Sequence, residues 1–461
     1  MRSTGSETRS HIRWLPRVGL ALALVAHGTM VASVLRQPFV VSARPDRERA
    51  PIWWLHNDTV HRVGPAADFF AVYHAGECVT RGASPYAGQQ PGERTPYYFP
   101  FRYLPLVAQT LGRAAAELAP RTAYWLWAGI LELLLATFLL SFWRYTRGWM
   151  RWLAAYVLLL SSPYFLEIHM GQFTFAAASL TGLALLLTEP RPGVGARWLA
   201  CGVGAVAYTG AVLLKVLPLV ILPALLRVRR AWLLAAAALV IALVAGGPHF
   251  LAHPEDWRRF YEANFGRPFG GIGAGNYGFS YWLFILGRGI APTWIDEHWS
   301  IVADTWRSAV LAVTVGLVLL ARRPRLVLAA VALLLAHFVS YAHVWEHHMS
   351  AVLVLGLLLL REHRPGPRAD AALGLGRTAG APAQRATLPP AAIVSLLAVL
   401  ILALPTPFVF LDVAKDSSVV DPSVNWSSAA RLLLAGSKAL PTLALYIVAV
   451  ATLCRRDRTL A

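Results

Sequence analysis

The sequence predicts an all-α polytopic membrane protein, a single transmembrane domain over residues 1–461 with about twelve transmembrane helices. Composition is the first reason: 57% of the 461 residues are hydrophobic and only 14% are charged, unlike soluble domains. The second reason is the length of the apolar runs, because a helix needs about 20 apolar residues to cross a hydrocarbon core. The runs lack the alternating polarity of barrel strands, so helices, which satisfy their own backbone groups in lipid, are expected.

The net charge of +18 is a feature shared with proteins that bind nucleic acid. Here, however, the arginines stand at the ends of apolar runs, as in WRYTRGWMR, LLRVRRAW and LLARRPRL, which is how the positive-inside bias appears. We therefore predict a lipid bilayer and no nucleic acid as partner, with both termini on the cytoplasmic side of a plasma membrane. Cys78, Cys201 and Cys454 fall in a loop, a membrane run and the basic tail, so no disulfide or cysteine metal site is expected.

The first apolar run, about residues 18–35, is longer than the roughly 7–15 residues of a signal-peptide core, so a retained anchor is expected. Residues 36–120 then form a long first exoplasmic loop that contains short helices. The next helices are expected at about residues 122–143, 152–166 and 173–188; a basic link joins the first two, and the short outer turn EIHMGQ joins the last two.

The stretch 198–227 has too many apolar residues for one helix, and Pro218 and Pro223 divide it. Proline inside a helix costs about 3 kcal/mol unless it marks a break, so two shorter helices are predicted to meet near Lys215 on the outer side. A second outer loop is expected at residues 248–300. The segment 361–388, rich in Gly, Ala, Pro and Arg, is predicted to be a disordered cytoplasmic linker. The remaining helices are expected at about residues 231–247, 303–320, 326–342, 346–360, 390–405 and 433–453.

Four polar sites fall on the same predicted outer face of this topology: Asp68, the turn from His169 to Gln172, Lys215, and the segment from Trp345 to His348. Ionisable groups at membrane depth are expensive, and where they occur they usually mark a substrate pathway or a reactive site. Their convergence on one face therefore predicts a site between the loops and the membrane.

Asp68 stands beside Phe69, Phe70 and Tyr73 in the first loop. A carboxylate in such surroundings has a raised pKa and suits a general base that accepts a proton from a hydroxyl. The competing interpretation is a helix N-cap, because Asp68 follows Gly-Pro-Ala-Ala and precedes an amphipathic run. The residues alone leave both interpretations open.

Lys215 suits a phosphate ligand, because its ammonium is a compact point charge; the alternative is a lysine that extends along apolar surface to the interface. His347 and His348 are adjacent, so in a helix they point about 100° apart and are poorly placed to chelate one metal. They suit hydrogen bonding to a phosphate or sugar, or else a place in the interfacial aromatic belt.

The motifs around these residues resemble a known family. The run DFFAVYHAGECVTRGASPY, followed by YYFPFRYLPLVAQTLG, is similar to the first outer loop of the family 87 glycosyltransferases, which are polyprenyl-phosphate-mannose-dependent membrane enzymes. Further similarities come in family order: GQFTFAAASL, LLKVLPLVILPALLRVRRAW and VWEHH. Together they span about Asp68 to Met349.

This resemblance implies a GT-C fold and an inverting transfer of a hexose, with mannose expected, from a polyprenyl-phosphate sugar to an envelope glycolipid or glycan on the exoplasmic face. Asp68 would be the general base, and Lys215, His347 and His348 would lie near the donor phosphate. No cofactor or metal is implied. The expected substrate-binding residues are Tyr73, Tyr86, Arg102, Tyr103 and Gln172. The alternatives are a transporter or flippase of a lipid-linked or amphipathic anion, in which Asp68 caps a helix, and a scaffold without chemistry.

Overall fold

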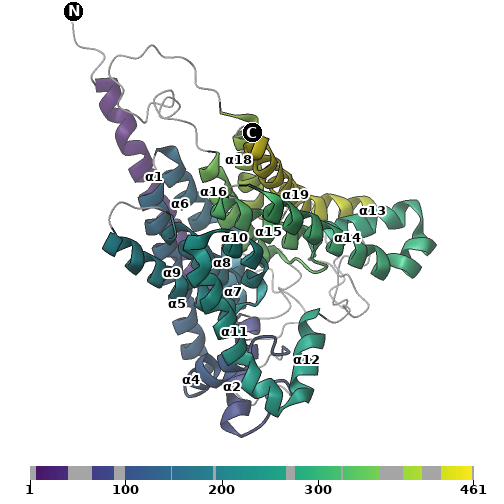
Figure 1. Cartoon of the computed structure of the whole chain (residues 1–461). Coiled ribbons are helices and arrows are strands. Elements are labelled where there is room, and N and C mark those ends of the chain that lie inside the picture. Colours follow the sequence, from purple (N-terminus) through teal and green to yellow (C-terminus); the bar gives the residue numbers. More distant parts are fainter. Residues whose placement is uncertain are drawn as a thin grey trace, which may run out of the picture.

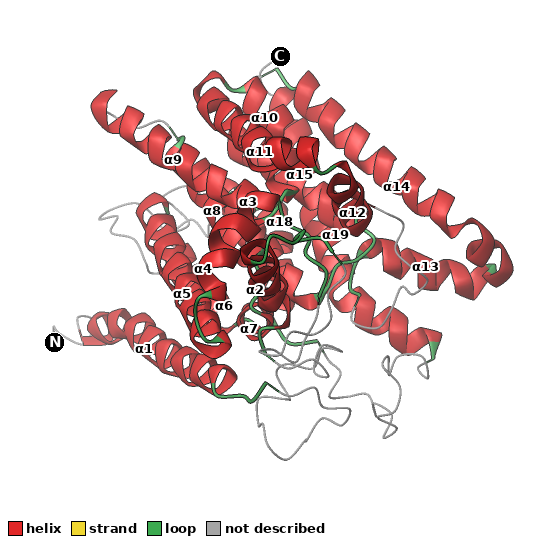
Figure 2. Cartoon of the chain, turned by 90° about the horizontal axis from the view of Figure 1, so that it is seen from below, coloured by secondary structure: helices red, strands yellow, loops and turns green. Residues whose placement is uncertain are grey.

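The fold is described by a computed structural model for nine segments of the chain: residues 7–39, 65–87, 99–146, 148–189, 194–265, 276–322, 325–363, 388–406 and 427–458. Within these segments every regular element is a helix (Figure 2). The predicted all-α class is confirmed.

The first part of the chain forms long helices interrupted by short turns. Its elements are α1 (Glu7–Leu35), α2 (Ala67–Thr80), α3 (Pro105–Val107), the π-helical η3 (Ala108–Gly112), α4 (Arg113–Ala116), α5 (Pro120–Tyr145), α6 (Trp149–Leu160), α7 (Ser162–Met170), α8 (Thr174–Leu187), α9 (Val194–Leu214), η4 (Leu217–Ile221), α10 (Leu222–Arg227) and η5 (Arg229–Ala231).

The second part continues with α11 (Trp232–Ala252), α12 (Pro254–Phe265), α13 (Phe279–Ile290), α14 (Pro292–Leu320), α15 (Leu326–Ser340), η6 (Glu346–His348), α16 (Met349–Glu362), α18 (Pro390–Ala403) and α19 (Ser428–Arg458). As predicted, the stretch 198–227 breaks near Lys215: α9 ends at Leu214, and a 3-10 turn that carries Pro218 starts the next piece.

Five of these helices are long and apolar enough to cross a membrane, and a sixth is obtained if α6 and α7 are one span bent by 45°. Several shorter apolar helices accompany them, among them α8, α15 and α18. The chain is thus a multi-pass membrane protein, whereas the predicted count of twelve spans is not confirmed.

Two predicted boundaries are wrong. The helix expected at 152–166 is instead α6 and α7, because Ser161 is extended and Pro163 starts a new helix, which runs on to Met170. The second outer loop, expected at 248–300, contains α12, α13 and the first part of α14. Most of the predicted linker 361–388 lies outside the described residues, as does part of the predicted first loop, 36–120.

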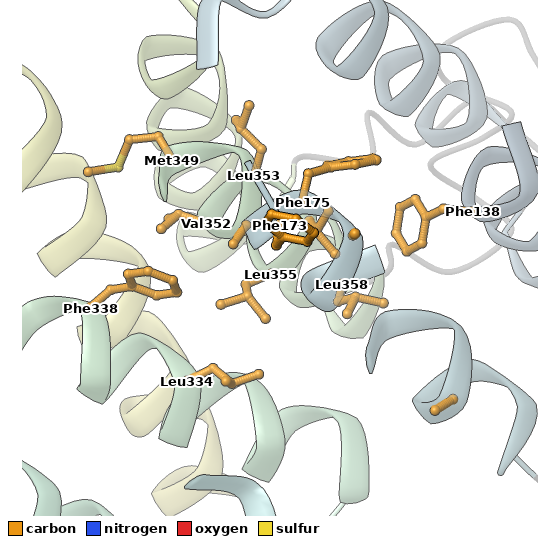
Figure 3. Packing of buried hydrophobic residues seen from close by; sticks show 14 of the residues in the cluster. Phe138, Phe173, Phe175, Leu334, Phe338, Met349, Val352, Leu353, Leu355 and Leu358 are labelled. Carbon is orange, nitrogen blue, oxygen red and sulfur yellow. The ribbon is translucent and has the colours of Figure 1, made fainter. Parts of the chain in front are cut away.

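The centre of the bundle is built around α15 and α16, most of whose residues are buried. Leu355 and Leu358 of α16 lie between Phe338 on α15 and Phe138 on α5 (Figure 3). In a membrane-spanning bundle such side chains stabilise the core by close van der Waals packing, because lipid is as apolar as the protein interior. This core holds η6, which precedes α16, in a fixed place.

α2, α4 and α12 gather at one end of the bundle, opposite the start of α1 and the end of α19 (Figure 1). Asp256, which is fully buried near the start of α12, ties this end together. Its Oδ1 accepts from Ser84 Oγ at 2.5 Å and from Arg259 Nη1 at 3.2 Å, and its Oδ2 is 2.9 Å from His249 Nε2. The segment after α2, which carries Ser84, is thereby bound to α11 and α12.

The contact between α2 and η3 is a crossing of two glycines. A Cβ atom on Gly76 would lie 2.0 Å from the backbone carbonyl atoms of Gly112, and a Cβ on Gly112 would lie 2.6 Å from the carbonyl oxygen of Val72. No side chain fits at these distances. This close approach fixes where α2 sits.

We therefore expect Gly76→Ala to lower the thermal unfolding midpoint of the purified protein, because forcing a methyl group into a packed contact costs about 1–3 kcal/mol. Gly129→Ala on α5 is the matched control, since a Cβ there meets nothing within 4 Å. Equal midpoints for the two variants would contradict this packing.

Candidate active site

Asp68 is placed by the first turn of α2. The helix is capped by Ala66, whose backbone is left-handed (φ 68°) and whose side chain makes no capping bond, so the N-cap interpretation of Asp68 is wrong. Asp68 is the one residue from Ala67 to Gly76 that keeps part of its surface open. Burial nevertheless raises the pKa of its carboxyl, against the opposing effects of Lys215, Gln172 and Arg102.

The turn between α7 and α8 holds the start of α2. The amide of Ala66 donates to the carbonyl of His169 at 2.6 Å. Gly171 is left-handed (φ 62°), and a Cβ on it would lie 2.6 Å from that of Phe69, so glycine is required by both conformation and space. The side chain of Gln172 accepts from the amide of Phe173 at 3.2 Å and hydrogen-bonds Asp68.

Lys215 lies in the break between α9 and η4. Its ammonium is 5.6 Å from the ring centroid of Tyr103 and interacts electrostatically with Asp68 and Glu167. Among the described residues, Nζ of Lys215 has no partner within hydrogen-bonding distance. A half-buried cation without a direct partner is a suitable ligand for an anion.

His347 and His348 lie in η6, with ring centroids 4.3 Å apart. The amide of Trp345 donates to His348 Nδ1 at 2.9 Å, so the proton of a neutral His348 is on Nε2. Within the described part of the chain, neither ring nitrogen of the buried His347 has a hydrogen-bond partner. Burial, and then the charge of Lys215, lowers the pKa of His347 to about 3. Both rings are therefore neutral donors and acceptors.

Arg102 and Tyr103 complete the group. Arg102 is exposed, interacts electrostatically with Asp68 and His348, and has its carbonyl held by Asn264 Nδ2 at 3.1 Å. The ring of Tyr103 is buried, 4.9 Å from the ring centroid of Phe173. Burial, and then the charge of Asp68, raises the pKa of Tyr103, so its phenol stays neutral.

The other two tyrosines of the predicted site lie behind it. Tyr86 donates from its hydroxyl to the carbonyl of Tyr103 at 2.5 Å, and so supports the segment that carries Arg102 and Tyr103. Tyr73 is fully buried, and its hydroxyl donates to the carbonyl of Leu118 at 2.8 Å. The structure thus brings together Asp68, Gln172, Lys215, His347, His348, Arg102 and Tyr103.

Comparison with known families identifies the family of the chain. The model of glycosyltransferase family 87 matches residues 98–359, more than half of the chain. The chain belongs to glycosyltransferase family 87. The matched range contains Lys215, Gln172 and the histidine pair, whereas Asp68 comes to the site from the segment before it.

Among solved structures, this family 87 chain is similar to the apo crystal structure of ArnT from Cupriavidus metallidurans. The similarity has 16% sequence identity and a TM-score of 0.33, and covers 88% of this chain and 75% of that chain. No curated protein sequence matches the chain.

Sequence reasoning missed two acidic residues beside the family 87 site. Glu167 is fully buried in α7, close enough to interact electrostatically with Lys215. Glu346 precedes the histidines and is also fully buried; it accepts from Thr406 Oγ1 at 2.6 Å and lies 3.8 Å from Lys438 Nζ. For Glu167, the available signal was an acid within a largely apolar stretch, which is expensive unless it has a partner.

The raised pKa of Asp68 predicts a pH-dependent stability. Because the folded protein favours the protonated carboxyl, ionisation of Asp68 destabilises the fold as pH rises through this raised pKa. We expect Asp68→Asn, which carries no charge, to raise the thermal unfolding midpoint at alkaline pH, and the gain to disappear toward about pH 4, where an ordinary aspartate is also protonated.

Glu255→Gln, at an exposed carboxyl on α12, is the control and should change the midpoint much less than Asp68→Asn does. A midpoint for Asp68→Asn below that of the unaltered protein throughout the range would mean that Asp68 stabilises the fold as an ion-pair partner.

Proposed function

We propose that this family 87 member is an inverting glycosyltransferase that moves a hexose, with mannose expected, from a polyprenyl-phosphate sugar to a hydroxyl of an envelope glycolipid or glycan. The observation that supports this most is the Asp68 carboxyl close to the Lys215 ammonium, which has no hydrogen-bond partner among the described residues, with the two neutral imidazoles of His347 and His348 in the same group. Family membership favours sugar transfer over the transport of a lipid-linked anion.

In the proposed reaction, Asp68 accepts the proton of the acceptor hydroxyl while the acceptor oxygen forms a bond to the anomeric carbon. The bond from that carbon to the phosphate oxygen breaks, and its electron pair stays on the phosphate, which leaves as a polyprenyl phosphate with one more negative charge. Attack and departure occur on opposite faces, so the anomeric configuration inverts. The raised pKa of Asp68 suits this role, because a base is most effective when its pKa approaches the working pH.

The departure of the phosphate explains the roles proposed for the remaining residues of the site. A phosphate departs as a stable anion, so it needs electrostatic stabilisation rather than a second carboxylic acid as in glycosidases. The Lys215 ammonium would supply the charge, and Nε2–H of His348 and the unpaired ring of His347 would supply hydrogen bonds. Arg102, Tyr103 and Gln172 stand beside Asp68, where an acceptor hydroxyl must approach.

The site is proposed to face the exoplasmic side of the plasma membrane, with both termini cytoplasmic. This placement is supported by the distribution of the arginines, which follow the ends of the apolar runs in the pattern of cytoplasmic links. Polyprenyl-phosphate donors are anchored in lipid, so their phosphate reaches a site only at the membrane edge.

Asp68→Asn tests the base. With radiolabelled polyprenyl-phosphate mannose, glucose and arabinofuranose as separate donors and a membrane extract as acceptor, the variant is expected to lose about 100- to 10,000-fold in transfer rate, the usual worth of a general base. Donor binding should be kept. The exposed Glu255→Gln on α12 is the control, and undiminished transfer by Asp68→Asn would remove Asp68 from this role.

Lys215→Met tests the phosphate ligand. A hydrogen bond to a charged group contributes about 1.5–3 kcal/mol, so we expect donor binding to weaken roughly 10- to 100-fold, with a smaller effect on acceptor binding. Arg258→Met, which removes an exposed cation on α12, is the control. Weaker acceptor binding with intact donor binding would disqualify Lys215 as the phosphate ligand.

A further inference from the structure

Glu346 is a fully buried acid that the proposed reaction does not use, and it directly precedes the histidine pair in the chain. Both of its oxygens have partners. Oε1 accepts from Ser162 Oγ of α7 at 3.1 Å and from the amide of Thr406 at 3.3 Å, and Oε2 accepts from Thr406 Oγ1 at 2.6 Å. Three hydrogen bonds from two segments distant in the sequence therefore hold the residue that begins η6.

Lys438 joins α19 to this carboxylate. Its ammonium is also fully buried and lies 3.8 Å from Oε1 of Glu346. It donates to the carbonyl of Leu402 at 3.0 Å and to that of Leu404, at the end of α18, where a helix leaves carbonyl groups without a partner of its own. The attraction between two buried charges is largely offset by the cost of removing both from water, so net stability alone does not explain this pair.

α7 connects this anchor with the other half of the site. Ser162 stands in the first turn of α7, and the turn that follows α7 binds the start of α2 through the bond from Ala66 to His169. The helix that places Asp68 therefore also holds the segment that carries the two histidines. One helix, hydrogen-bonded at each end, thus relates the position of the proposed base to that of the proposed phosphate ligands.

η6 depends on such contacts because it is short. It is a single 3-10 turn, a form with poorer hydrogen-bond geometry than an α-helix. Neither ring nitrogen of the buried His347 has a hydrogen-bond partner among the described residues, so no such bond directs this ring. Its direction follows from the backbone of η6, which α16 holds at one end and Glu346 at the other.

We propose that Glu346, with Lys438 as its counter-ion, is a positioning residue: bound to α7, α18 and α19, its carboxylate holds η6 so that the rings of His347 and His348 face the donor phosphate. The inference rests on the proposed function for the identity of that phosphate, but not for the hold on η6. It gives α18 and α19, which lie beyond the matched residues 98–359, a part in the site.

Thr406→Val and Ser162→Ala test the hold on η6 without a donor. Each removes one hydroxyl from Glu346 and keeps the ion pair. Hydrogen exchange of the full-length protein in detergent, read by mass spectrometry, should become roughly fivefold faster in the peptide that contains η6, the effect of one net hydrogen bond. The amides of Trp345 and His348, which are hydrogen-bonded in the turn, report this change.

Thr181→Val on α8 is the matched control. Its hydroxyl is as buried as that of Thr406, but it bonds the carbonyl of Ala177 in its own helix at 2.7 Å, so exchange in η6 should not change. Unchanged exchange in both Thr406→Val and Ser162→Ala would overturn the proposal. Variants of Lys438 are less suitable, because breaking a buried ion pair leaves an uncompensated charge that destabilises the whole fold.

A double-mutant cycle separates positioning from a merely structural role. The probe is radiolabelled polyprenyl-phosphate mannose, whose equilibrium binding is measured without an acceptor. We expect Thr406→Val to weaken donor binding roughly fivefold, and by about twofold or less when His347→Ala is already present, because a residue through which it acts has then been removed. Equal weakening on both backgrounds would overturn the proposal and leave Glu346 a structural residue.

The transfer assay gives a separate outcome. In Thr406→Val the KM for the donor should rise while the KM for the acceptor stays unchanged, a split that a general loss of folded protein does not produce. Absence of donor binding and transfer by the unaltered protein would refute the proposed function, whereas hydrogen exchange in η6 would still decide whether Glu346 holds this turn.

Discussion

The constraint on which the site depends is the cost of charge inside a protein that lies in lipid. Burying an isolated ionised group in such a place costs several kcal/mol of free energy. Each ionisable group must therefore be paired, be neutral, or keep part of its surface exposed. Asp68 is partly exposed, and His347 and His348 are neutral because burial lowers their pKa values. Lys215 remains: burial lowers the pKa of its ammonium, and the carboxyl groups of Asp68 and Glu167 oppose this shift without forming a hydrogen bond to it among the described residues.

The fold accepts local strain to maintain this arrangement. Ala66 is the one non-glycine residue of the described chain with positive φ, a conformation that costs about 1–2 kcal/mol. It stands two residues before Asp68 and is bonded to His169 in the turn that also carries Gly171 and Gln172. Such strain is often found at functional sites, where contacts with the surrounding structure hold the residue in its unfavourable conformation. Here the surroundings are α7, α8 and the glycine crossing of α2.

Most of the long helices could be predicted from the sequence because apolar length is a direct signal of a membrane helix, and the break at Lys215 because Pro218 marks it. The convergence of Asp68, Lys215 and His347 followed from placing the arginine-rich links on one side. α12 was missed because it is amphipathic and polar on average, so a search for apolar runs passes over it. Glu167 was missed because its segment was taken for a turn, whereas α7 continues to Met170.

Lys438 and Lys215 show how a structural cation differs from one available to a ligand. Lys438 donates to the carbonyls of Leu402 and Leu404 at the end of α18, and lies beside Glu346, so its charge is fully used in joining α18 and α19 to η6. Lys215, in contrast, is only half-buried, and none of the described residues binds its ammonium directly. Its hydrogen-bonding capacity is therefore available to a ligand, which is consistent with the anion proposed for this place.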